Sequence, residues 1–493
     1  MASPPGARAA RAPEFLISGR DARPTCENPV SEPTPPPPSQ NPEPSPAPRP
    51  QRPALLQIAR YSHSRARRVF LQYGLPWGGA LLVGLVAVLY AQWSEDAYEL
   101  FLHWIQGRSW LAFVITPVMT MIAVYMTRKW FSGSEGSGIP QVIAALHAPP
   151  DETLMSRLFG LRVIVGKLVV SLIGFLGGLT IGREGPTVHL GAAIMAETRR
   201  FYPHQGRRME RALLLAGAAA GLSGAFNTPL AGVIFAIEEL ARDFESRTNG
   251  VMITAVVFSG LTSLALAGNY LYFGQLNVPQ NFHIGFALPV VVIAVLCGLA
   301  GASFNWALLR WEVWMPAPLR NWRAHKPLLY ALVIGLAVAA LGVLTHGQTW
   351  GSGYDPARRL LEGKAPLSEA YALTKWMAMI ISYMSGMPGG LFSPSLSIGA
   401  GLAQWVHLLF AWAPLPALIA LCMTGYLAAV TQSPLTSFVI VMEMTNGTGM
   451  VIPMMAVALV ASRISNVFTP PLYEALAEKN YFGGAKGHAP AAG

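Results

Sequence analysis

Gly182-Arg183-Glu184-Gly185-Pro186 opens the apolar run over residues 186–197 and places a carboxylate between two glycines at the start of a predicted helix. Proline is tolerated there because the first N–H groups of a helix have no intrahelical partner. Glycine lets the backbone approach a ligand closely, and the free N–H groups at the positive end of the helix dipole favour an anion. The stretch therefore predicts an anion-facing helix N-terminus, at which Glu184 competes as a tethered anion.

Two further glycine-rich junctions open apolar helices in the same way. They are Gly136-Ser137-Gly138-Ile139-Pro140 and Gly389-Gly390-Leu391-Phe392-Ser393-Pro394. One junction alone is typical of a tight turn between helices. Three together favour an anion pathway without a buried Lys or Arg, which would hold the ion too tightly for rapid release.

The composition predicts that much of this 493-residue chain lies in lipid. Hydrophobic residues make up 52% and charged residues 12%, against about 25% charged residues in soluble domains. Disorder, collagen-like repeats and coiled coil are excluded for most of the chain. The net charge of +10 follows the positive-inside rule and forms no nucleic-acid footprint. Three widely separated cysteines, Cys26, Cys297 and Cys422, exclude a disulfide framework and a thiolate metal site.

Many of the apolar stretches are too short to cross the membrane as single helices, because a span needs about 20 residues for ~30 Å of hydrocarbon. Short, broken helices at membrane depth are tolerated only where protein or a watery cavity covers them. We therefore predict an all-α polytopic membrane protein with a transporter or channel core. The stretches are 75–93, 109–126, 159–181, 186–197, 212–224, 229–240, 251–267, 285–309, 327–345, 371–385, 395–412, 415–431, 434–444 and 450–468.

The first 54 residues are proline-rich and include a run from Pro35 to Pro38. Such a stretch predicts a disordered tail with polyproline II character, and a proline-rich ligand for a partner is the alternative. It has no apolar core of the signal-peptide kind. The basic cluster Arg60, Arg65, Arg67 and Arg68 precedes the first apolar stretch, which predicts a cytoplasmic N-terminus.

Two pairs of segments repeat at nearly the same offset. A P-L-x7-E pattern begins at Pro229 and again at Pro434, 205 positions later (434 minus 229). A G-x-x-x-P pattern begins at Gly182 and again at Gly390, 208 positions later (390 minus 182). Basic residues flank only the first P-L-x7-E segment, which predicts two halves of opposite orientation; chance similarity of apolar segments is the alternative. The flanking residues are Arg207, Arg208, Arg211, Arg242 and Arg247.

The motifs GSGIP, GREGP and GGLFSP, with the stretches 226–232 and 471–473, resemble the signature of the CLC chloride channel and transporter family over about residues 65 to 478. The resemblance implies a homodimer with one pore per subunit and an inverted repeat of tilted, broken helices. We expect a tail over 1–54, a transport domain over 55–478 with halves of roughly 75–267 and 285–473, and a short cytoplasmic tail over 479–493 without paired CBS domains. Gln141 replaces the family's usual Glu, which predicts a change in a local hydrogen bond.

The resemblance also implies a chloride site. Ser137 matches the serine whose hydroxyl coordinates the central chloride, where proline would favour nitrate. Tyr473 matches the tyrosine that closes the inner side of the site, although an interfacial aromatic is the alternative on residue type alone. Backbone N–H groups face the ion at the matching positions in the third motif. The expected chloride-binding residues are Ser137, Gly138, Ile139, Leu391, Phe392 and Tyr473.

Glu184 is expected to be the external gate, supported by the rest of its motif. Ionised, it occupies the N–H donors that bind chloride, and protonated it swings away; a Glu that merely favours the helix dipole is the alternative. The supporting residues are Gly182, Arg183, Gly185 and Pro186.

Glu238 and Glu239 differ in their echoes in the second half. Glu238 echoes Glu443, which predicts a structural role through helix capping or pairing with Arg. Glu239 echoes Met444 and matches the position of the family's internal proton-transfer glutamate. A solvated cytoplasmic carboxylate is the alternative for Glu239.

No cofactor or metal site is expected. His189 has no His or carboxylate partner at helical spacing, which favours a packed histidine, and no Walker A, HExxH or GxSxG motif anchors an enzyme. The prediction is a chloride/proton antiporter of a bacterial inner membrane with both termini cytoplasmic. A passive voltage- or pH-gated chloride channel and a fluoride/proton exchanger are the alternatives within the fold. Ser137 makes the fluoride/proton exchanger less favoured. An intramembrane enzyme or a scaffold is the alternative from another class.

Overall fold

The computed structural model describes residues 74–148, 152–201, 206–241, 249–268, 271–276, 278, 284–364 and 366–482. The proline-rich tail, the basic cluster before the first span, Arg242 and Arg247 lie outside the described residues, and so does most of the predicted C-terminal tail. Within the described ranges the chain is helical, and its β-structure is confined to two isolated bridges. The predicted all-α fold is confirmed.

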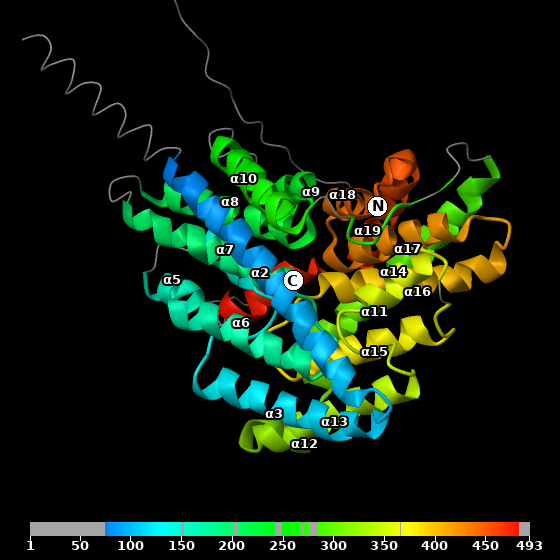
Figure 1. Ribbon diagram of the computed structural model, residues 1–493, viewed down its shortest axis with the longest axis horizontal. Helices are drawn as coiled ribbons and strands as arrows, with labels where there is room; N and C mark the ends of the chain where they lie inside the picture. The colour runs from blue at the N-terminus through cyan, green and yellow to red at the C-terminus, as the bar shows by residue number, and fades with distance from the viewer. Residues whose placement is uncertain are drawn as a thin grey trace, which may run out of the picture. The chain divides into compact units, whose positions relative to one another are not determined.

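The first half of the described chain contains helices of very unequal length (Figure 1). They are α2 (Leu75–Ile105), α3 (Ala112–Lys129), α4 (Ile139–His147), α5 (Glu152–Phe159), α6 (Leu161–Leu176), α7 (Glu184–Glu197), α8 (Gly206–Phe226), α9 (Pro229–Phe235) and α10 (Asn249–Ala267). A π-helical turn, Ala236–Ala241, continues α9.

The second half repeats this alternation of long and short helices. They are α11 (Ala287–Trp314), α12 (Ala317–His325), α13 (Pro327–Leu344), α14 (Tyr354–Leu361), α15 (Tyr371–Met384), α16 (Phe392–Leu409), α17 (Leu415–Thr431), α18 (Pro434–Thr445), α19 (Val451–Phe468) and α20 (Leu472–Ala477). A π-helical turn, Glu478–Phe482, follows α20.

Seven helical segments among the described residues are long and apolar enough to cross a membrane. Large apolar side chains on their outer faces are exposed, as at Leu261 of α10 and Ile452 of α19. The chain is therefore a multi-pass membrane protein. The central helices are different, because α7 has only 14 residues and spans about 21 Å at 1.5 Å per residue. Nearly all residues of α7 are buried, so protein covers this short helix on all sides.

The segments that begin at Pro229 and Pro434 are linked by reciprocal caps. Each carboxylate at the far end of one segment accepts hydrogen bonds from the first turn of the other, so the two segments run antiparallel. Leu230 and Ala231 donate their N–H groups to Glu443 at 3.1 and 2.7 Å, and Leu435 and Thr436 donate theirs to Glu238 at 3.0 and 2.6 Å. The predicted structural role of Glu238 is confirmed as capping. The predicted inverted orientation is confirmed for this pair of segments.

Figure 1 shows α3 and α13 packed side by side, although they belong to different halves of the chain. Pro117 of α3 meets Gly335 of α13 so closely that a Cβ at Gly335 would lie 2.9 Å from the Pro117 nitrogen. The absence of a side chain at Gly335 therefore lets the two helices approach across the boundary between the halves.

Candidate functional site

The three glycine-rich junctions meet in space through backbone hydrogen bonds. Gly182 and Gly390 exchange two of these bonds, at 2.8 and 2.7 Å, in an isolated antiparallel bridge. Gly389 donates its N–H group to the Gly136 carbonyl oxygen at 3.3 Å. The predicted convergence of the three motifs is therefore confirmed.

Glycine is required where the first junction meets α7. Gly138 has a φ of +108°, a conformation that side chains with a Cβ rarely adopt. A Cβ at Gly138 would also lie 2.8 Å from the Gly185 carbonyl oxygen. A Cβ at Gly185 would lie 2.7 Å from the Ser137 carbonyl oxygen. Gly138 and Gly185 thus allow the chain before α4 to press directly on the start of α7.

Glu184 is the first residue of α7, and its side chain is fully buried. Its carboxylate reaches the start of α16, where it accepts a hydrogen bond from the Ser393 hydroxyl and a second one from the Ser393 N–H group at 3.4 Å. A carboxylate is therefore held at the N-terminus of a helix from the other half of the chain, where the helix dipole stabilises a negative charge. Gly182 lies against the same carboxylate, and Pro186 is buried in the first turn of α7.

Ser137 and Tyr473 are buried hydroxyl-bearing residues, with exposed fractions of 1% and 0%. Neither hydroxyl has a hydrogen-bond partner of normal geometry in the part of the chain that the structure describes, and the two hydroxyls lie near each other. Buried hydroxyl groups are normally hydrogen-bonded. Two unpartnered hydroxyls at one point therefore mark a place where a polar or anionic guest can be bound.

The third motif supplies the wall of this place. Leu391 is the N-cap of α16 and Phe392 is its first residue, so their N–H groups belong to the unpaired start of the helix. The Phe392 ring stacks on the Tyr473 ring, with centroids 6.1 Å apart and planes 12° from parallel. The ring also packs against Phe226 and Phe235. Ile139 is the first residue of α4 and is fully buried.

Arg183 turns away from the carboxylate that follows it in sequence. Its guanidinium group donates to the Ala91 carbonyl oxygen at 2.9 Å and to Glu95 at 2.8 Å, and it lies 5.3 Å from the centre of the Tyr272 ring. The side chain is buried, whereas that of Glu95 is half-exposed. Arg183 thereby fixes the start of α7 against α2.

Glu239 lies in the π-helical turn after α9, with an exposed fraction of 2%. Its carboxylate accepts a hydrogen bond from the Ser433 hydroxyl, across the boundary between the two halves. The alternative of a solvated carboxylate is therefore wrong. The Glu239 carboxylate is within electrostatic range of the Tyr473 phenol.

Two subsidiary predictions can be checked directly. His189 is buried, its Nε2 atom lies 2.8 Å from the Leu158 carbonyl oxygen, and its ring meets Phe159 edge to face. The prediction of a packed histidine is confirmed. Gln141 donates to the Glu135 carbonyl oxygen at 2.6 Å, so the unusual residue does make a local hydrogen bond.

Sequence reasoning missed two fully buried lysines, Lys167 on α6 and Lys375 on α15. Lys167 donates to the Gly136 carbonyl oxygen at 3.1 Å, directly before Ser137. Lys375 donates to carbonyl oxygens of residues 349–351 at 2.8 to 3.3 Å. A charged residue inside an apolar stretch is costly in a membrane and marks a functional or structural site. That signal was present in the stretches 159–181 and 371–385.

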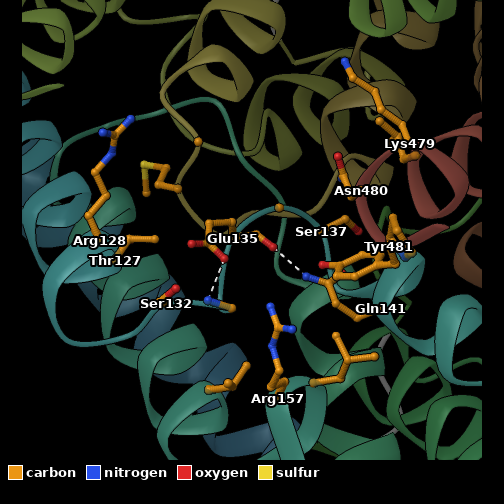
Figure 2. A pocket seen from close by; sticks show the side chains of 18 of the residues that line it. Thr127, Arg128, Ser132, Glu135, Ser137, Gln141, Arg157, Lys479, Asn480 and Tyr481 are labelled. Carbon is orange, nitrogen blue, oxygen red and sulfur yellow. Dashed lines mark hydrogen bonds between the residues drawn. The ribbon is translucent and has the colours of Figure 1, made fainter. Parts of the chain in front are cut away.

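A cavity of about 1010 Å³ leads to Ser137. Its lining carries five basic and two acidic side chains, which gives an excess of three positive charges; they are Arg128, Arg157, Arg162, Arg323, Lys479, Glu135 and Glu312. Figure 2 shows Arg128, Arg157 and Lys479 approaching the cavity from three different parts of the chain. Arg323 and Lys479 both pair with Glu312, at 2.9 and 2.8 Å. A cavity with this excess of positive charge concentrates anions in front of Ser137.

These features define a multi-pass membrane protein whose broken helices bring several N-termini to one buried, anion-favouring point. The chain belongs to the voltage gated chloride channel family, whose model matches residues 118–466. It is 29% identical over 388 residues to the H(+)/Cl(-) exchange transporter ClcA of Salmonella arizonae, an alignment that covers 74% of this chain and 78% of the relative.

Two solved structures share the fold. A slow cyanobacterial Cl-/H+ antiporter has a TM-score of 0.68 and 23% identity, over 82% of this chain and 97% of that chain. A CLC-type fluoride/proton antiporter has a TM-score of 0.68 and 22% identity, over 81% of this chain and 96% of that chain. At this identity the likeness establishes the fold, and the choice of anion has to be argued from the site.

Proposed function

We propose that this protein is a chloride/proton antiporter. The observation that carries the proposal is the buried Glu184 carboxylate on the N-terminus of α16, beside the buried hydroxyls of Ser137 and Tyr473, which have no hydrogen-bond partner among the described residues. A carboxylate that occupies helix N-terminal donors is a tethered competitor for an anion. One titratable group then controls both the anion path and the movement of a proton.

In this proposal chloride binds between the three motifs. The hydroxyls of Ser137 and Tyr473 and the N–H groups at the starts of α4 and α16 are its donors, from Gly138, Ile139, Leu391 and Phe392. Such a site attracts an anion through partial charges alone, so it can also release the anion rapidly. The cavity with its excess of positive charge supplies chloride to the Ser137 side.

Glu184 is proposed as the external gate and Glu239 as the internal proton-transfer group. Gly182, Gly185 and Pro186 shape the backbone around the gate, and Arg183 anchors it to α2 through Glu95. Ionised Glu184 blocks the donors of α16, and protonated Glu184 leaves them to chloride. Because Glu239 is buried and lies within electrostatic range of Tyr473, it is a suitable acceptor for protons from the side opposite to Glu184.

We further propose that the protein is a homodimer with one pore per subunit in the inner membrane of a bacterium, with both termini cytoplasmic. Exposed apolar side chains on α10 and α19, such as Leu261 and Ile452, are suited to contact with lipid or a second subunit. The relatives are named as transporters, which agrees with a protein that is not an enzyme.

The test is transport by the purified protein in liposomes with a chloride gradient, with pH and chloride recorded together. Wild-type protein should move protons against their gradient as chloride runs down. Glu184→Gln resembles the protonated gate, so its chloride flux should persist, lose its pH dependence and carry no protons. Glu238→Gln is the matched control, because it changes a half-buried helix cap next to Glu239 and should keep proton coupling.

Each alternative has its own result in this assay. Chloride flux without protons in the wild type would make the protein a passive channel. Proton uptake driven by fluoride at a much higher rate than by chloride would make it a fluoride exchanger. A Glu184→Gln protein that still pumps protons would contradict the gate assignment.

A further inference from the structure

Ser433 is the N-cap residue of α18, and its side chain makes an unusual contact for that position. An N-cap serine normally accepts a hydrogen bond from its own helix, but no such bond is formed here. The Ser433 hydroxyl instead donates to the Glu239 carboxylate of the other half. Both side chains are buried, with exposed fractions of 4% and 2%.

The inverted repeat contains a natural comparison for Ser433. Thr228 lies 205 positions earlier (433 minus 228) and is the N-cap of α9, with φ and ψ of −126° and 80° against −117° and 82° at Ser433. Thr228 is also buried, and its hydroxyl has no hydrogen-bond partner among the described residues. The residue that echoes Glu239 is Met444, which offers no acceptor of the carboxylate kind. An N-cap hydroxyl is thus present in both halves, but within the described residues only that of Ser433 faces a carboxylate, that of Glu239.

The backbone of Ser433 is fixed within its own half. Its N–H group donates to the Thr431 hydroxyl at 3.3 Å, and its carbonyl oxygen accepts from the Ser437 hydroxyl at 2.8 Å. The next two N–H groups of α18 are held by Glu238. The Ser433 hydroxyl therefore has a defined position from which to orient the Glu239 side chain.

A hydroxyl suits a carboxyl group that changes its protonation state. It can donate to the ionised carboxylate and, after rotation, accept from the protonated acid. Because Glu239 is buried, loss of this donor would remove one of the contacts that orient its side chain in a site without bulk water. A proton is transferred efficiently only when the group that carries it stays within hydrogen-bond reach of its partner.

We propose that Ser433 is a positioning residue for proton transfer, which holds the Glu239 carboxylate in its working orientation from the first turn of α18. This inference rests on the proposed antiport and on the role proposed for Glu239. Ser433 itself neither binds chloride nor carries the proton.

The experiment measures protons moved per chloride in liposomes for five full-length proteins: wild type, Ser433→Ala, Ser433→Thr, Thr228→Ala and Glu239→Gln. Ser433→Ala should keep the chloride flux within about twofold and lower the proton-to-chloride ratio about fivefold, because one hydrogen bond to a charged group is lost. Ser433→Thr restores the hydroxyl and should restore the ratio. Thr228→Ala should leave the ratio unchanged.

The results separate this inference from the proposal on which it depends. A wild-type protein without proton movement, or a Glu239→Gln protein that still pumps, would contradict the proposed function. Normal coupling in the wild type, loss of coupling in Glu239→Gln and an unchanged ratio in Ser433→Ala would overturn the role of Ser433 alone. Equal losses in Ser433→Ala and Thr228→Ala would also overturn it, since they would reveal a general capping effect. Should Ser433→Ala not fold, Ser433→Cys retains the size with a weaker donor, and an unchanged ratio in that variant would overturn the inference.

Discussion

The loops before α4 and α14 share the sequence Gly-Ser-Gly and the same left-handed glycine conformations. They differ in whether the hydroxyl of the central serine is hydrogen-bonded. Gly136-Ser137-Gly138 and Gly351-Ser352-Gly353 both have left-handed glycines, with φ of +70° and +108° in the first loop and +64° and +82° in the second. A buried lysine holds carbonyl oxygens of each loop, and these lysines, Lys167 and Lys375, are 208 positions apart (375 minus 167). This is the offset of the G-x-x-x-P motifs.

The serine at the centre of each loop has a different environment. The Ser137 hydroxyl is buried and has no hydrogen-bond partner within the ranges that the structure describes, whereas the half-buried Ser352 hydroxyl accepts from the Tyr354 N–H group at 3.4 Å. The first turn of α14 also carries Asp355, which favours the positive end of the helix dipole, whereas the first turn of α4 has no acidic residue. The second loop therefore satisfies polar groups at the start of α14 with its own side chains. The first loop leaves the Ser137 hydroxyl and the start of α4 available to bind an anion. A repeated fold can thus have one open and one closed copy of the same site.

The largest effect is expected from Lys375→Met. The substitution removes the donor from three buried carbonyl groups, which should cost about 3 kcal/mol of the free energy of unfolding. The measurement is the thermal unfolding midpoint of the purified protein in detergent, followed by tryptophan fluorescence. Lys167→Met is the matched variant and should cost less, because Lys167 holds two carbonyl groups at 3.1 and 3.4 Å. Equal midpoints for the two variants would mean that the lysine sites are energetically equivalent.

A second prediction concerns the anion. Ser137→Pro removes a hydroxyl donor and alters the loop, so the preference for chloride over nitrate should fall about tenfold, the effect of one lost hydrogen bond of ~1.4 kcal/mol. Ser352→Ala removes the equivalent hydroxyl from the closed loop and should leave the preference unchanged. Anion competition in the liposome flux assay measures both. A similar loss in both variants would contradict the distinction between open and closed loops.

A third prediction concerns the aromatic wall of the open site. Tyr473→Ala removes both a buried hydroxyl and the ring that stacks on Phe392, so chloride binding should weaken about fivefold and coupling should loosen. Titration calorimetry with chloride measures the affinity. Tyr473→Phe separates the two contributions, since it keeps the ring and loses only the hydroxyl. Unchanged binding in both variants would remove Tyr473 from the site.

The smallest effect is expected at the reciprocal caps. Glu443→Gln and Glu238→Gln each replace a charged acceptor of two N–H groups with a neutral one, which should cost about 1 kcal/mol. Because the caps are equivalent, the thermal midpoints of the two variants should agree closely, and coupling should be retained in both. A loss of coupling confined to Glu238→Gln would show that this cap also serves its neighbour Glu239.

The sequence predicted those parts of the site that depend on local chemistry. Glycine, proline and a carboxylate in the GREGP motif predict a helix N-terminus from local chemistry alone. The repeated offset of the G-x-x-x-P pattern predicted a second such N-terminus in the other half, in the opposite orientation. The partner of Glu238, however, could not be predicted, because helix capping and an ion pair with Arg were both compatible with the sequence. The choice depends on the approach of α18, which no local pattern specifies.

Long-range contacts explain what the sequence did not predict. Glu239 is buried and accepts a hydrogen bond from Ser433, 194 positions away, whereas the same position at the end of a lone helix would be solvated. The unpartnered state of the Ser137 hydroxyl likewise depends on the distance to Tyr473, which is set by α20. Lys167 and Lys375 were visible as charges in apolar stretches, but their acceptors lie in loops of irregular backbone.

The contact between Glu184 and Ser393 has a consequence for biosynthesis. The two residues are 209 positions apart, so at an elongation rate of about 5 to 20 residues per second the ribosome needs roughly 10 to 40 s to pass from one to the other. During that interval α7 is too short to span the bilayer alone and carries a carboxylate that has no partner from α16. The nascent first half must therefore remain incompletely inserted, or be bound by other factors, until α16 has been synthesised. A protein truncated after α10 should accordingly be degraded by the quality-control proteases of its membrane.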